Sequence, residues 1–595
     1  MVASRRQASA VDRELDSSVT YLRRRLLAWH AKCGRLLPWR AGRTAFEVLI
    51  AEVLLQKTDA NKVWRVYEPF IECFPDAATL AGASPREIRR HLQPLGLLYR
   101  ATRLKQMAST IVGRHEGKVP DDSAELMALP GVGAYIAAAV RCFAFGHREV
   151  LVDANFSRVY GRYFGLGDVG RPERSSALRE MAANVTPPRQ FAAFDQAVLD
   201  FAATICLPRN PKCRCCPVRA NCRAREVHRT DAVIGIDLFA GAGGLSRGAA
   251  EAGLQIAYAV EADPKPASTY EINIPGVVVV KERLRLGYAE KLCQSLGLTV
   301  GSVDVIFAGP PCQGFSTSNL RTRNDANQDN HLWRIVVEFA RHLRPQAVVL
   351  ENVGGMEKYN DGRVVEAIAR EFGRLGYATE TQRLNACEFG VPQHRVRLFI
   401  MCAKHGLPRP IVPAVKRLVT VGEAIGDLPV VPNGNNEDRL PYRLNGAALN
   451  LFQRKMRDGK RGVVGNCRAS LSTGLIVRRF AQVPPGGNWQ DIPKSLFRGY
   501  SKPENCHRWL YRRLRPELPA VTVSNFRKNM LIHPSQNRTL TVREAARLQS
   551  IDDGFVFLGN LQSQQQQVAN AVPPPLAKAV TRAVLSCLVR KRGDA

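Results

Sequence analysis

The chain has 595 residues, which is too many for one hydrophobic core, because single cores stop growing at roughly 250 to 300 residues; two or three domains are expected. With 85 Lys and Arg residues against 53 Asp and Glu residues, the formal charge of +32 favours a polyanionic partner, nucleic acid first and a membrane surface second. No segment approaches the roughly 18 apolar residues that span a bilayer, and the start MVASRRQASAVDRELD has no apolar signal region, so the sequence predicts a cytoplasmic protein without disulfides.

The first third of the chain has a helical pattern. Apolar positions recur every three or four residues in AFEVLIAEVLLQK (45–57) and YIAAAVRCFAFG (135–146). Just before the second of these, LPGVG (129–133) predicts a tight turn between two helices. Gly131 and Gly133 would leave backbone N–H groups exposed near a helix N-terminus, which is a natural seat for a DNA phosphate.

Five cysteines follow within residues 206–222. Six, two and five residues separate Cys206, Cys213, Cys216 and Cys222, which leaves Cys215 as an extra. In a reducing compartment, four thiolates on one short loop favour a metal centre over disulfides. The residues alone allow either zinc or a [4Fe-4S] cluster, and base rates favour zinc.

Five segments together carry a family resemblance: LPWR (37–40), PLGLLYRA (94–101), the LPGVG turn, LVDANFSRVYGRYFG (151–165) and the cysteine loop. They resemble the helix-hairpin-helix DNA glycosylases of the endonuclease III and MutY superfamily, over about residues 25–225. The resemblance implies an all-α glycosylase domain. It also implies that Cys206, Cys213, Cys216 and Cys222 hold a [4Fe-4S] cluster rather than zinc.

The resemblance assigns roles to individual residues. Asp153 takes the place of the catalytic carboxylate that stabilises positive charge on the sugar, a role compatible with capping a helix. Bifunctional members carry a nucleophilic lysine where this chain has Tyr135, so base excision without strand nicking is expected. Tyr135 and VDANF look most like the thymine-DNA mismatch branch, which removes thymine or uracil opposite guanine, whereas LPWR and Glu52 are shared with adenine-excising MutY. Gln56 and Leu97 match positions that fill the gap left by a flipped base.

From residue 233 the pattern changes to alternating strands and helices. VIGIDLFAGAGGLSRGAAEAG (233–253) is a short β-rich run, a glycine loop and a helix, and IAYAVEAD, VDVIFAGPP, AVVLENV and RLFIMCA are further buried-strand candidates. This alternation predicts a doubly wound, Rossmann-like α/β sheet. Glu261 lies twenty residues beyond Gly241, where an acidic residue can bind the ribose of an adenosine-containing cofactor.

A second resemblance covers nearly all of residues 233–590. GPPCQGFS (309–316), ENV (351–353), FGVPQHRVRLFIM (389–401), RTLTVREAARLQS (538–550) and QVANAVPPPLAKAV (567–580) resemble the motif series of DNA cytosine-5 methyltransferases, in the ordinary order. The resemblance makes Cys312 the nucleophile that adds to C6 of a flipped cytosine. Glu351 would act at N3, Arg397 would hold O2, and Arg395 would support them.

S-adenosylmethionine is the cofactor that this resemblance implies. Its contacts would come from Phe239, Gly241, Gly243, Glu261 and Asn570. Two departures from the family pattern stand out in the sequence. Ala569 replaces the usual glycine before Asn570, where it could crowd the loop slightly, and VVVVKERLRLG (277–287) lacks the usual Asp-Ile, so the contact to the adenine amino group is unassigned.

The expected organisation has five parts: an N-terminal extension (1–24), the glycosylase domain (25–225), a linker (226–232), the methyltransferase catalytic domain (233–404 and 536–590) and a target-recognition domain (405–535). The polar tract QSQQQQ (562–567) is predicted to be a solvated helix entry.

We therefore expect a bifunctional enzyme on double-stranded DNA, by analogy from a bacterial restriction-modification system or an orphan methyltransferase. It would methylate cytosine and excise the thymine or uracil that deamination leaves opposite guanine. Two alternatives stay open: the first half excises 5-methylcytosine or adenine, or it only tethers the methyltransferase to DNA.

Overall fold

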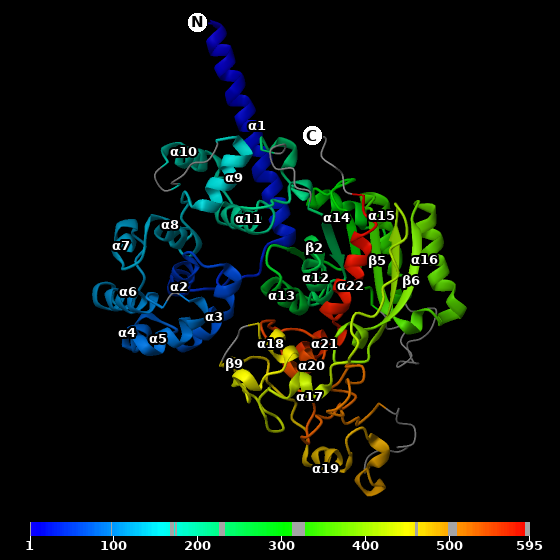
Figure 1. The fold of residues 1–595 in the computed structure, drawn as a ribbon. Helices are drawn as coiled ribbons and strands as arrows, with labels where there is room; N and C mark the ends of the chain where they lie inside the picture. The colour runs from blue at the N-terminus through cyan, green and yellow to red at the C-terminus, as the bar shows by residue number, and fades with distance from the viewer. Residues whose placement is uncertain are drawn as a thin grey trace. The chain divides into compact units, whose positions relative to one another are not determined.

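The computed structural model describes residues 2–96, 98–166, 172, 175–224, 232–311, 328–458, 462–497 and 509–589. The chain divides into two compact units near residue 230, one helical and one mixed α/β (Figure 1). This is the multidomain fold class expected from the sequence. Within the described ranges, no helix is long and apolar enough to cross a membrane.

The first unit is built from helices. Their bounds are α1 (Val2–Cys33), α2 (Ala45–Leu55), α3 (Ala60–Cys73), α4 (Ala77–Gly82), α5 (Pro85–Leu92), α6 (Arg100–His115), α7 (Ser123–Ala128), α8 (Ala134–Phe143), α9 (Ala154–Phe164), α10 (Ser176–Val185) and α11 (Phe191–Thr204). Helix α1 runs without a break across residue 25, where the sequence suggested that an N-terminal extension ends.

Local sequence explains where the helices next to the candidate site begin. Helix α2 starts at a capping box, in which the Thr44 side chain accepts from the Glu47 N–H and the Glu47 carboxylate accepts from the Thr44 N–H. Helices α7 and α8 are joined by the turn 129–133, with Gly131 at a φ of 89° that only glycine adopts readily. Val132 and Leu129 of this turn are buried, so the turn is anchored while Gly133 stays exposed.

A buried carboxylate fixes the segment between α1 and α2. Asp200 on α11 accepts hydrogen bonds from both Nη atoms of Arg40, at 2.8 and 2.9 Å, and from the Arg35 backbone N–H at 2.9 Å. Beside it, Trp29 and Phe201 meet edge to face with ring centroids 5.9 Å apart. The LPWR segment is therefore held against α11 by a bidentate ion pair.

The second unit contains a seven-stranded sheet with strand order β3-β2-β1-β4-β5-β7-β6. The strands are β1 (Ile234–Leu238), β2 (Gln255–Val260), β3 (Val278–Val280), β4 (Val305–Ala308), β5 (Ala347–Val353), β6 (Ala378–Asn385) and β7 (Val396–Ala403). The β1–β2, β1–β4 and β4–β5 pairs are parallel, whereas β7 is antiparallel to both of its neighbours. The strand order reverses between β1 and β4, which is where doubly wound sheets bind ligands.

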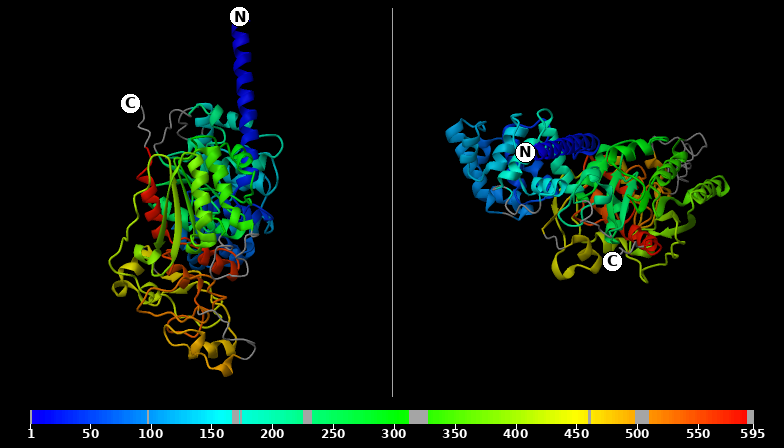
Figure 2. Two further views of the ribbon diagram at one scale, coloured as in Figure 1. Left: turned by 90° about the vertical axis from the view of Figure 1, so that its right-hand side faces the viewer. Right: turned by 90° about the horizontal axis from the view of Figure 1, so that it is seen from above.

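Helices cover both faces of this sheet (Figure 2). They are α12 (Gly244–Glu251), α13 (Pro264–Asn273), α14 (Ala289–Leu296), α15 (Trp333–Leu343), α16 (Arg363–Arg374) and α22 (Pro574–Leu585). Helix α12 packs closely against α22 and the residues just before it. A Cβ added at Gly244 would lie 2.4 Å from the Val572 oxygen, and a Cβ added at Gly248 would lie 2.3 Å from the Pro574 oxygen. The glycines thus let the end of the chain dock beside the first glycine loop.

In residues 405–458, 462–497 and 509–535 the structure has only short elements, and the described region beyond them is helical. The bounds are α17 (Val421–Ile425), β8 (Leu440–Pro441), α18 (Leu451–Arg457), β9 (Val463–Val464), α19 (Gly474–Gln482), α20 (Val542–Arg547) and α21 (Leu561–Asn570). One hydrophobic core joins α17 and the 514–531 segment to α20 and α21, while a separate small core surrounds Phe480 and Tyr511. The expected target-recognition segment therefore shares a core with the helices that follow it.

The interpretation of QSQQQQ as a solvated helix entry is wrong. The tract lies inside α21, and Gln564, Gln565 and Gln567 are at most 5% exposed. The Gln565 amide donates to Ser470 Oγ at 2.9 Å, and that of Gln567 donates to the Leu558 oxygen at 3.0 Å. Glutamine is polar enough to look solvated in sequence, yet here its amides satisfy neighbouring polar groups inside the fold.

Candidate functional sites

Three helices of the first unit bring Glu52, Tyr135 and Asp153 into one site. Glu52 lies on α2, which packs against α8; Tyr135 is in the first turn of α8, and Asp153 precedes α9. The three groups interact electrostatically: the Asp153 charge adds to the rise in the pKa of Glu52, and both carboxylates add to the rise in the pKa of Tyr135. Glu52 and Tyr135 are 83 positions apart in the sequence, and Tyr135 and Asp153 are 18 positions apart. The fold nevertheless brings the three together in one cluster.

Asp153 is the N-cap of α9. Its Oδ1 accepts from the backbone N–H groups of Asn155 and Phe156 at 2.8 and 3.0 Å, and its Oδ2 accepts from the Asn155 side chain at 2.8 Å. Burial raises the pKa of Asp153, although these hydrogen bonds oppose that effect. The cap therefore holds the carboxylate in one orientation.

Glu52 is a buried carboxyl group on a helix whose other core-facing residues are apolar, and it is only 6% exposed. Burial, reinforced by the charge of Asp153, raises the pKa of Glu52 to about 7, against a smaller opposing effect of Arg40. Near neutral pH this group can therefore hold a proton and donate it. Burial also raises the pKa of Tyr135 well above its usual value, so the phenol stays protonated.

The turn between α7 and α8, where the sequence predicts a phosphate seat, leads into an exposed helix N-terminus. Gly133 is the N-cap of α8, and this ten-residue helix directs its first backbone N–H groups toward the exposed turn. The Gln56 amide, at the end of α2, donates to the Gly131 carbonyl oxygen at 3.1 Å. Leu97 lies outside the described residues, but Leu98 and Tyr99 next to it are 42% and 53% exposed. Sequence reasoning did not single out Tyr99, although this aromatic residue stands in the PLGLLYRA segment.

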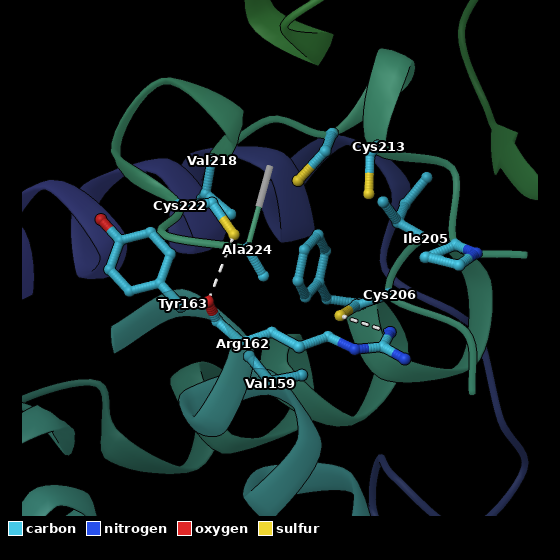
Figure 3. Close-up of a pocket in the computed structure, with 12 residues that line it drawn as sticks. Val159, Arg162, Tyr163, Ile205, Cys206, Cys213, Val218, Cys222 and Ala224 are labelled. Carbon is cyan, nitrogen blue, oxygen red and sulfur yellow. Dashed lines mark hydrogen bonds between the residues drawn. The ribbon is translucent and has the colours of Figure 1, made fainter. Parts of the chain in front are cut away.

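The four predicted cysteine ligands line one cavity of about 30 Å³ (Figure 3). Cys206, Cys213, Cys216 and Cys222 share it with apolar side chains such as Val159 and Phe201. Burial raises the pKa of Cys213 to about 11 and that of Cys216 well above its usual value, and the neighbouring cysteines contribute to both shifts. Cys215 is fully buried but does not line the cavity. The fifth cysteine thus stands apart from the set of four.

Two arginines of α9 connect this loop to the Asp153 cap. Arg158 donates from Nε to the Cys206 carbonyl oxygen at 2.8 Å and from Nη2 to Asn155 Oδ1 at 2.9 Å. Arg162, one turn later, donates to Cys206 Sγ at 3.6 Å and to the Leu207 oxygen at 2.7 Å (Figure 3). Sequence reasoning missed both, although their i, i+4 spacing places them on one face of the helix.

In the second unit, Glu351 and Arg397 form an ion pair beside the end of β4. Their residues lie diagonally on adjacent antiparallel strands, and Arg397 Nε is 3.0 Å from Glu351 Oε1. Burial raises the pKa of Glu351, while Arg397 and Arg395 oppose the rise. Glu351 Oε2 lies 3.5 Å from the position that a Cβ on Gly309 would occupy. The carboxylate therefore stands at the start of the loop that follows β4.

Cys312, on that loop, lies outside the described residues. The segment leading to it is described: the Asn352 amide donates to the Pro310 oxygen at 3.4 Å, and Asn352 is buried. The described ends of β4 and β5 therefore bring the approach to Cys312 next to Glu351.

Arg395 occupies a different kind of place from Arg397. It is 1% exposed, and its two Nη atoms donate to the carbonyl oxygens of Val523 at 3.2 Å and Ala569 at 2.8 Å. The guanidinium thus ties β7 to two distant backbone segments. The supporting role that the sequence assigns to Arg395 stays a prediction.

The glycine loop after β1 has the backbone geometry of a nucleotide site. Phe239, Gly241 and Gly243 all have positive φ, and a Cβ on Gly243 would lie 2.4 Å from Ile274 and 2.8 Å from Tyr270. Glu261, just after β2, accepts from the Gly241 N–H at 2.8 Å and, through its other oxygen, from the Asp263 N–H at 2.8 Å. A carboxylate offers about four lone-pair directions, so Glu261 keeps acceptor capacity for ribose hydroxyls.

Asn570 ends α21, where its side-chain oxygen accepts from Gln566 at 2.8 Å. Ala569 before it has helical backbone and no positive φ, so the position does not need the conformational freedom of glycine. After β3, the Glu282 carboxylate accepts from the Tyr288 hydroxyl, and the Glu261 N–H bonds to the Val280 oxygen. The sequence left this edge of the cofactor site unassigned.

Comparison with known proteins agrees with this division of the chain. Residues 233–586 match the family of C-5 cytosine-specific DNA methylases, and residues 50–185 match the HhH-GPD superfamily of base excision DNA repair proteins. The Type II methyltransferase M1.HphI of Haemophilus parahaemolyticus is 36% identical over 355 residues, covering 59% of this chain and 86% of that protein. M.DdeI of Desulfomicrobium norvegicum is 35% identical over 373 residues, covering 59% and 88%.

Among solved structures, a thermostable thymine-DNA glycosylase is 34% identical to this chain. The alignment covers 37% of this chain and 99% of the glycosylase chain, with a TM-score of 0.34. The methylase match spans more than half of the chain and includes the glycine loop, Glu351, Arg397 and Asn570. This protein therefore belongs to the C-5 cytosine-specific DNA methylase family and carries an HhH-GPD superfamily domain ahead of its methyltransferase domain.

Proposed function

We propose that this protein methylates cytosine C5 in a specific DNA sequence and, with its first unit, excises thymine or uracil mispaired with guanine. The observation that carries the second activity is the cluster of Glu52, Tyr135 and Asp153, in which a tyrosine stands where a lysine would be needed to form a Schiff base. The two activities complement each other, because deamination of 5-methylcytosine produces thymine opposite guanine.

In the excision step, the Asp153 carboxylate faces the sugar and stabilises the positive charge that develops as the base leaves. Glu52, with its pKa near 7, donates a proton to an oxygen of the departing pyrimidine. Tyr135 stays protonated and can donate a hydrogen bond without attacking the sugar. Water then completes hydrolysis, leaving an abasic site and an intact strand.

The four cysteines that line the cavity fit a [4Fe-4S] cluster. Arg162 donates to Cys206 Sγ, as expected beside a thiolate that carries negative charge. Within the described part of the chain, no group of three or more His, Cys, Asp or Glu side chains is close enough to hold a single metal ion. Four cysteines around one cavity offer a [4Fe-4S] cluster one thiolate for each iron. When bound, the cluster would stabilise the folded loop.

In the methyltransferase site, we assign the Cys312 thiolate to add to C6 of a flipped cytosine, while Glu351 protonates N3 and Arg397 holds O2. The raised pKa of Glu351 favours the protonated form that this role requires. S-adenosylmethionine supplies the methyl group when bound. Phe239, Gly241, Gly243, Glu261 and Asn570 would hold it, and Glu282, whose carboxylate can accept from an amino group, is our candidate for the unassigned contact to adenine.

The excision activity is tested on matched duplexes that carry G:T, G:U, A:G, or 5-methylcytosine opposite G, with alkali revealing abasic sites. Cleavage of G:T and G:U that disappears in Asp153→Asn supports the proposal. Activity on A:G would identify an adenine glycosylase, for which the raised pKa of Glu52 would also be suited, and activity on 5-methylcytosine would identify a demethylating enzyme. No activity on any duplex would leave a DNA-binding module.

The methylation activity is tested by transfer of a labelled methyl group to double-stranded DNA, followed by mapping of the modified position. Cys312→Ser is the matched variant, because it removes the thiolate and keeps a side chain of similar size. Methylation of adenine, or at cytosine N4, would contradict the proposed chemistry.

A further inference from the structure

Three segments of the first unit that are expected to face DNA are joined by a short chain of hydrogen bonds. They are the end of α2 with Gln56, the turn before α6 with Tyr99, and the turn between α7 and α8 with Gly131. Arg100, the first residue of α6, links the first two, and the Gln56 side chain links the first to the third.

Arg100 satisfies backbone carbonyl groups at the end of α2. Its Nη1 donates to the Leu54 carbonyl oxygen at 2.7 Å, and its Nη2 donates to the Gln56 carbonyl oxygen. The last carbonyl groups of a helix have no partner within the helix, and they form the negative end of its dipole. A cation at this end donates to the unpartnered carbonyl groups and offsets their partial negative charge. The second effect matters most where a polyanion such as DNA is to approach.

The geometry requires the forked guanidinium of arginine. The two acceptors are carbonyls of residues two apart, and Arg100 reaches both from a site where only 3% of the residue is exposed. A lysine ammonium is a single point charge on a flexible stem and cannot match this pair in the same way. The buried arginine is thus explained by the two carbonyl oxygens that it pairs at the end of α2.

The Gln56 side chain then extends the link to the hairpin turn. Its Nε2 donates to the Gly131 carbonyl oxygen at 3.1 Å, so the peptide after Gly131, which leads into the exposed N-terminus of α8, is held relative to α2. A second side chain supports the same arrangement: the Arg103 guanidinium lies 5.3 Å from the centre of the Tyr99 ring, and its Cδ is 3.8 Å from where a Cβ on Gly131 would be.

We propose that Arg100 is a positioning residue for base flipping, which acts by holding the end of α2 so that Gln56 can set the hairpin turn. This inference rests on the proposed glycosylase function. In this role Arg100 itself contacts neither the base nor the phosphates. It fixes the relative positions of the three segments, so that the gap-filling side chain and the phosphate seat can bind the same lesion. Misplacement by about 1 Å can slow a catalysed step by about 100-fold.

The test uses the full-length protein and a G:T duplex with 2-aminopurine next to the mispaired thymine, so that base flipping and excision are read separately. The variants are Arg100→Met, Arg100→Lys, Gln56→Ala and the double variant Arg100→Met with Gln56→Ala. Arg114→Met is the matched control, because it removes the same charge from an exposed site near the far end of α6. Thermal unfolding and binding to an undamaged duplex are measured for each variant.

Arg100→Met is expected to slow single-turnover excision at saturating enzyme by about tenfold or more and to reduce the 2-aminopurine signal, with binding to undamaged DNA unchanged. Arg100→Lys should recover part of the loss. Because Arg100 acts through Gln56, the double variant should be no slower than the slower single variant. Effects that multiply, or an Arg100→Met rate equal to that of Arg114→Met, would overturn the proposal.

Two further outcomes are distinguishable. If Arg100→Met fails to fold, the same cycle with Arg100→Lys and Gln56→Ala decides between coupled and independent effects. If the wild-type protein excises no base, the proposed function fails, and the 2-aminopurine signal alone decides the role of Arg100: a signal lost in Arg100→Met supports it, whereas an equal signal or none in the wild type overturns it.

Discussion

Asp153 is an observed helix cap, and we propose that the same carboxylate is catalytic. The hydrogen bonds from Asn155 and Phe156 are those of an ordinary helix N-cap, yet they also fix the direction of the group and oppose the rise of its pKa that burial causes. The sequence predicted that capping and catalysis can coexist in this carboxylate, and the cap geometry is compatible with both.

Replacement of Asp153 separates these roles. Asparagine is about as good an N-cap as aspartate, so Asp153→Asn should leave the thermal unfolding temperature nearly unchanged. Because the neutral amide cannot stabilise a developing positive charge, the excision rate should fall on the order of 10²- to 10³-fold. Single-turnover abasic-site formation and calorimetry check the two halves of this expectation. A large loss of stability with a small loss of rate would make Asp153 a cap only.

Glu52 predicts a pH dependence. Its pKa rises from 4.5 to about 7, so the proton that it can donate is present below pH 7 and is lost as the pH rises through that value. The excision rate constant should therefore be highest on the acid side of pH 7 and decline above it. By the same linkage, the free energy of unfolding should fall as the pH rises from about 4.5, the ordinary pKa, to about 7, and should level off above that value.

Glu52→Gln is the matched variant for this prediction, because an amide keeps the shape and carries no titrating proton. Its rate should be lower than that of the wild type at pH 6 and nearly independent of pH from about 6 to 8. A wild-type rate that increases through pH 7 would mean that the ionised form of Glu52 acts instead.

At the scale of elements, the close approach of α12 and α22 connects the two ends of the methyltransferase motif series. Gly244 and Gly248 present bare backbone to Val572 and Pro574, and Asn570 precedes this contact directly. The glycines that look like parts of a nucleotide loop in sequence thus also serve helix packing.

Gly244→Ala should disturb this packing, because the new methyl group would lie 2.4 Å from a backbone oxygen. Overpacking of this kind costs about 1 to 3 kcal/mol, and separation of the helices should weaken binding of S-adenosylmethionine. Calorimetric titration with the cofactor and thermal unfolding measure both effects. Gly373→Ala in α16 is the control, because no atom lies within 4 Å of its added Cβ and alanine favours a helix. Equal effects of the two substitutions would contradict the packing argument.

The cysteine loop provides a comparison between neighbouring residues. Cys216 lines the cavity and Cys215 does not, although both are cysteines within one turn of chain. Cys216→Ala should therefore lose most of the bound iron and the visible absorbance of the purified protein, whereas Cys215→Ala should retain both. Iron analysis and absorption spectra decide the matter. Equal retention in both variants would exclude the proposed ligand set, and bound zinc in place of iron would exclude the cluster.

At the scale of the whole molecule, the formal charge of +32 is the property that bears most on DNA affinity. Both units are proposed to act on DNA, and basic side chains release counterions when they meet phosphates. Affinity for a duplex without target site or mismatch should fall linearly on a logarithmic salt scale, by about 10³-fold or more between about 50 and 200 mM salt if six or more phosphates are contacted. Fluorescence anisotropy measures this. A slope near zero would mean that the excess charge lies away from the DNA.

Much of this protein follows from the sequence because its motifs are local. The helical pattern, the LPGVG turn, the glycine loop and the cysteine spacing each depend on a few neighbouring residues, so the two-part fold class was predictable, and the family matches agree with it. The antiparallel place of β7 between β5 and β6 was not, because strand pairing is decided by contacts across the sheet. The buried glutamines of α21 were misread for the same reason.

Residue types and their order along the chain by themselves determined which chemistry is possible: a carboxylate at 153, a tyrosine at 135 and four spaced cysteines. Only the tertiary structure decided which of these groups meet. It placed Glu52 beside Asp153, left Cys215 outside the cavity that the four other loop cysteines line, directed Arg395 to the carbonyls of two distant backbone segments, and joined Arg100 to Gln56. Burial and electrostatic coupling depend on distances through space, and a linear sequence does not specify those distances until the chain has packed.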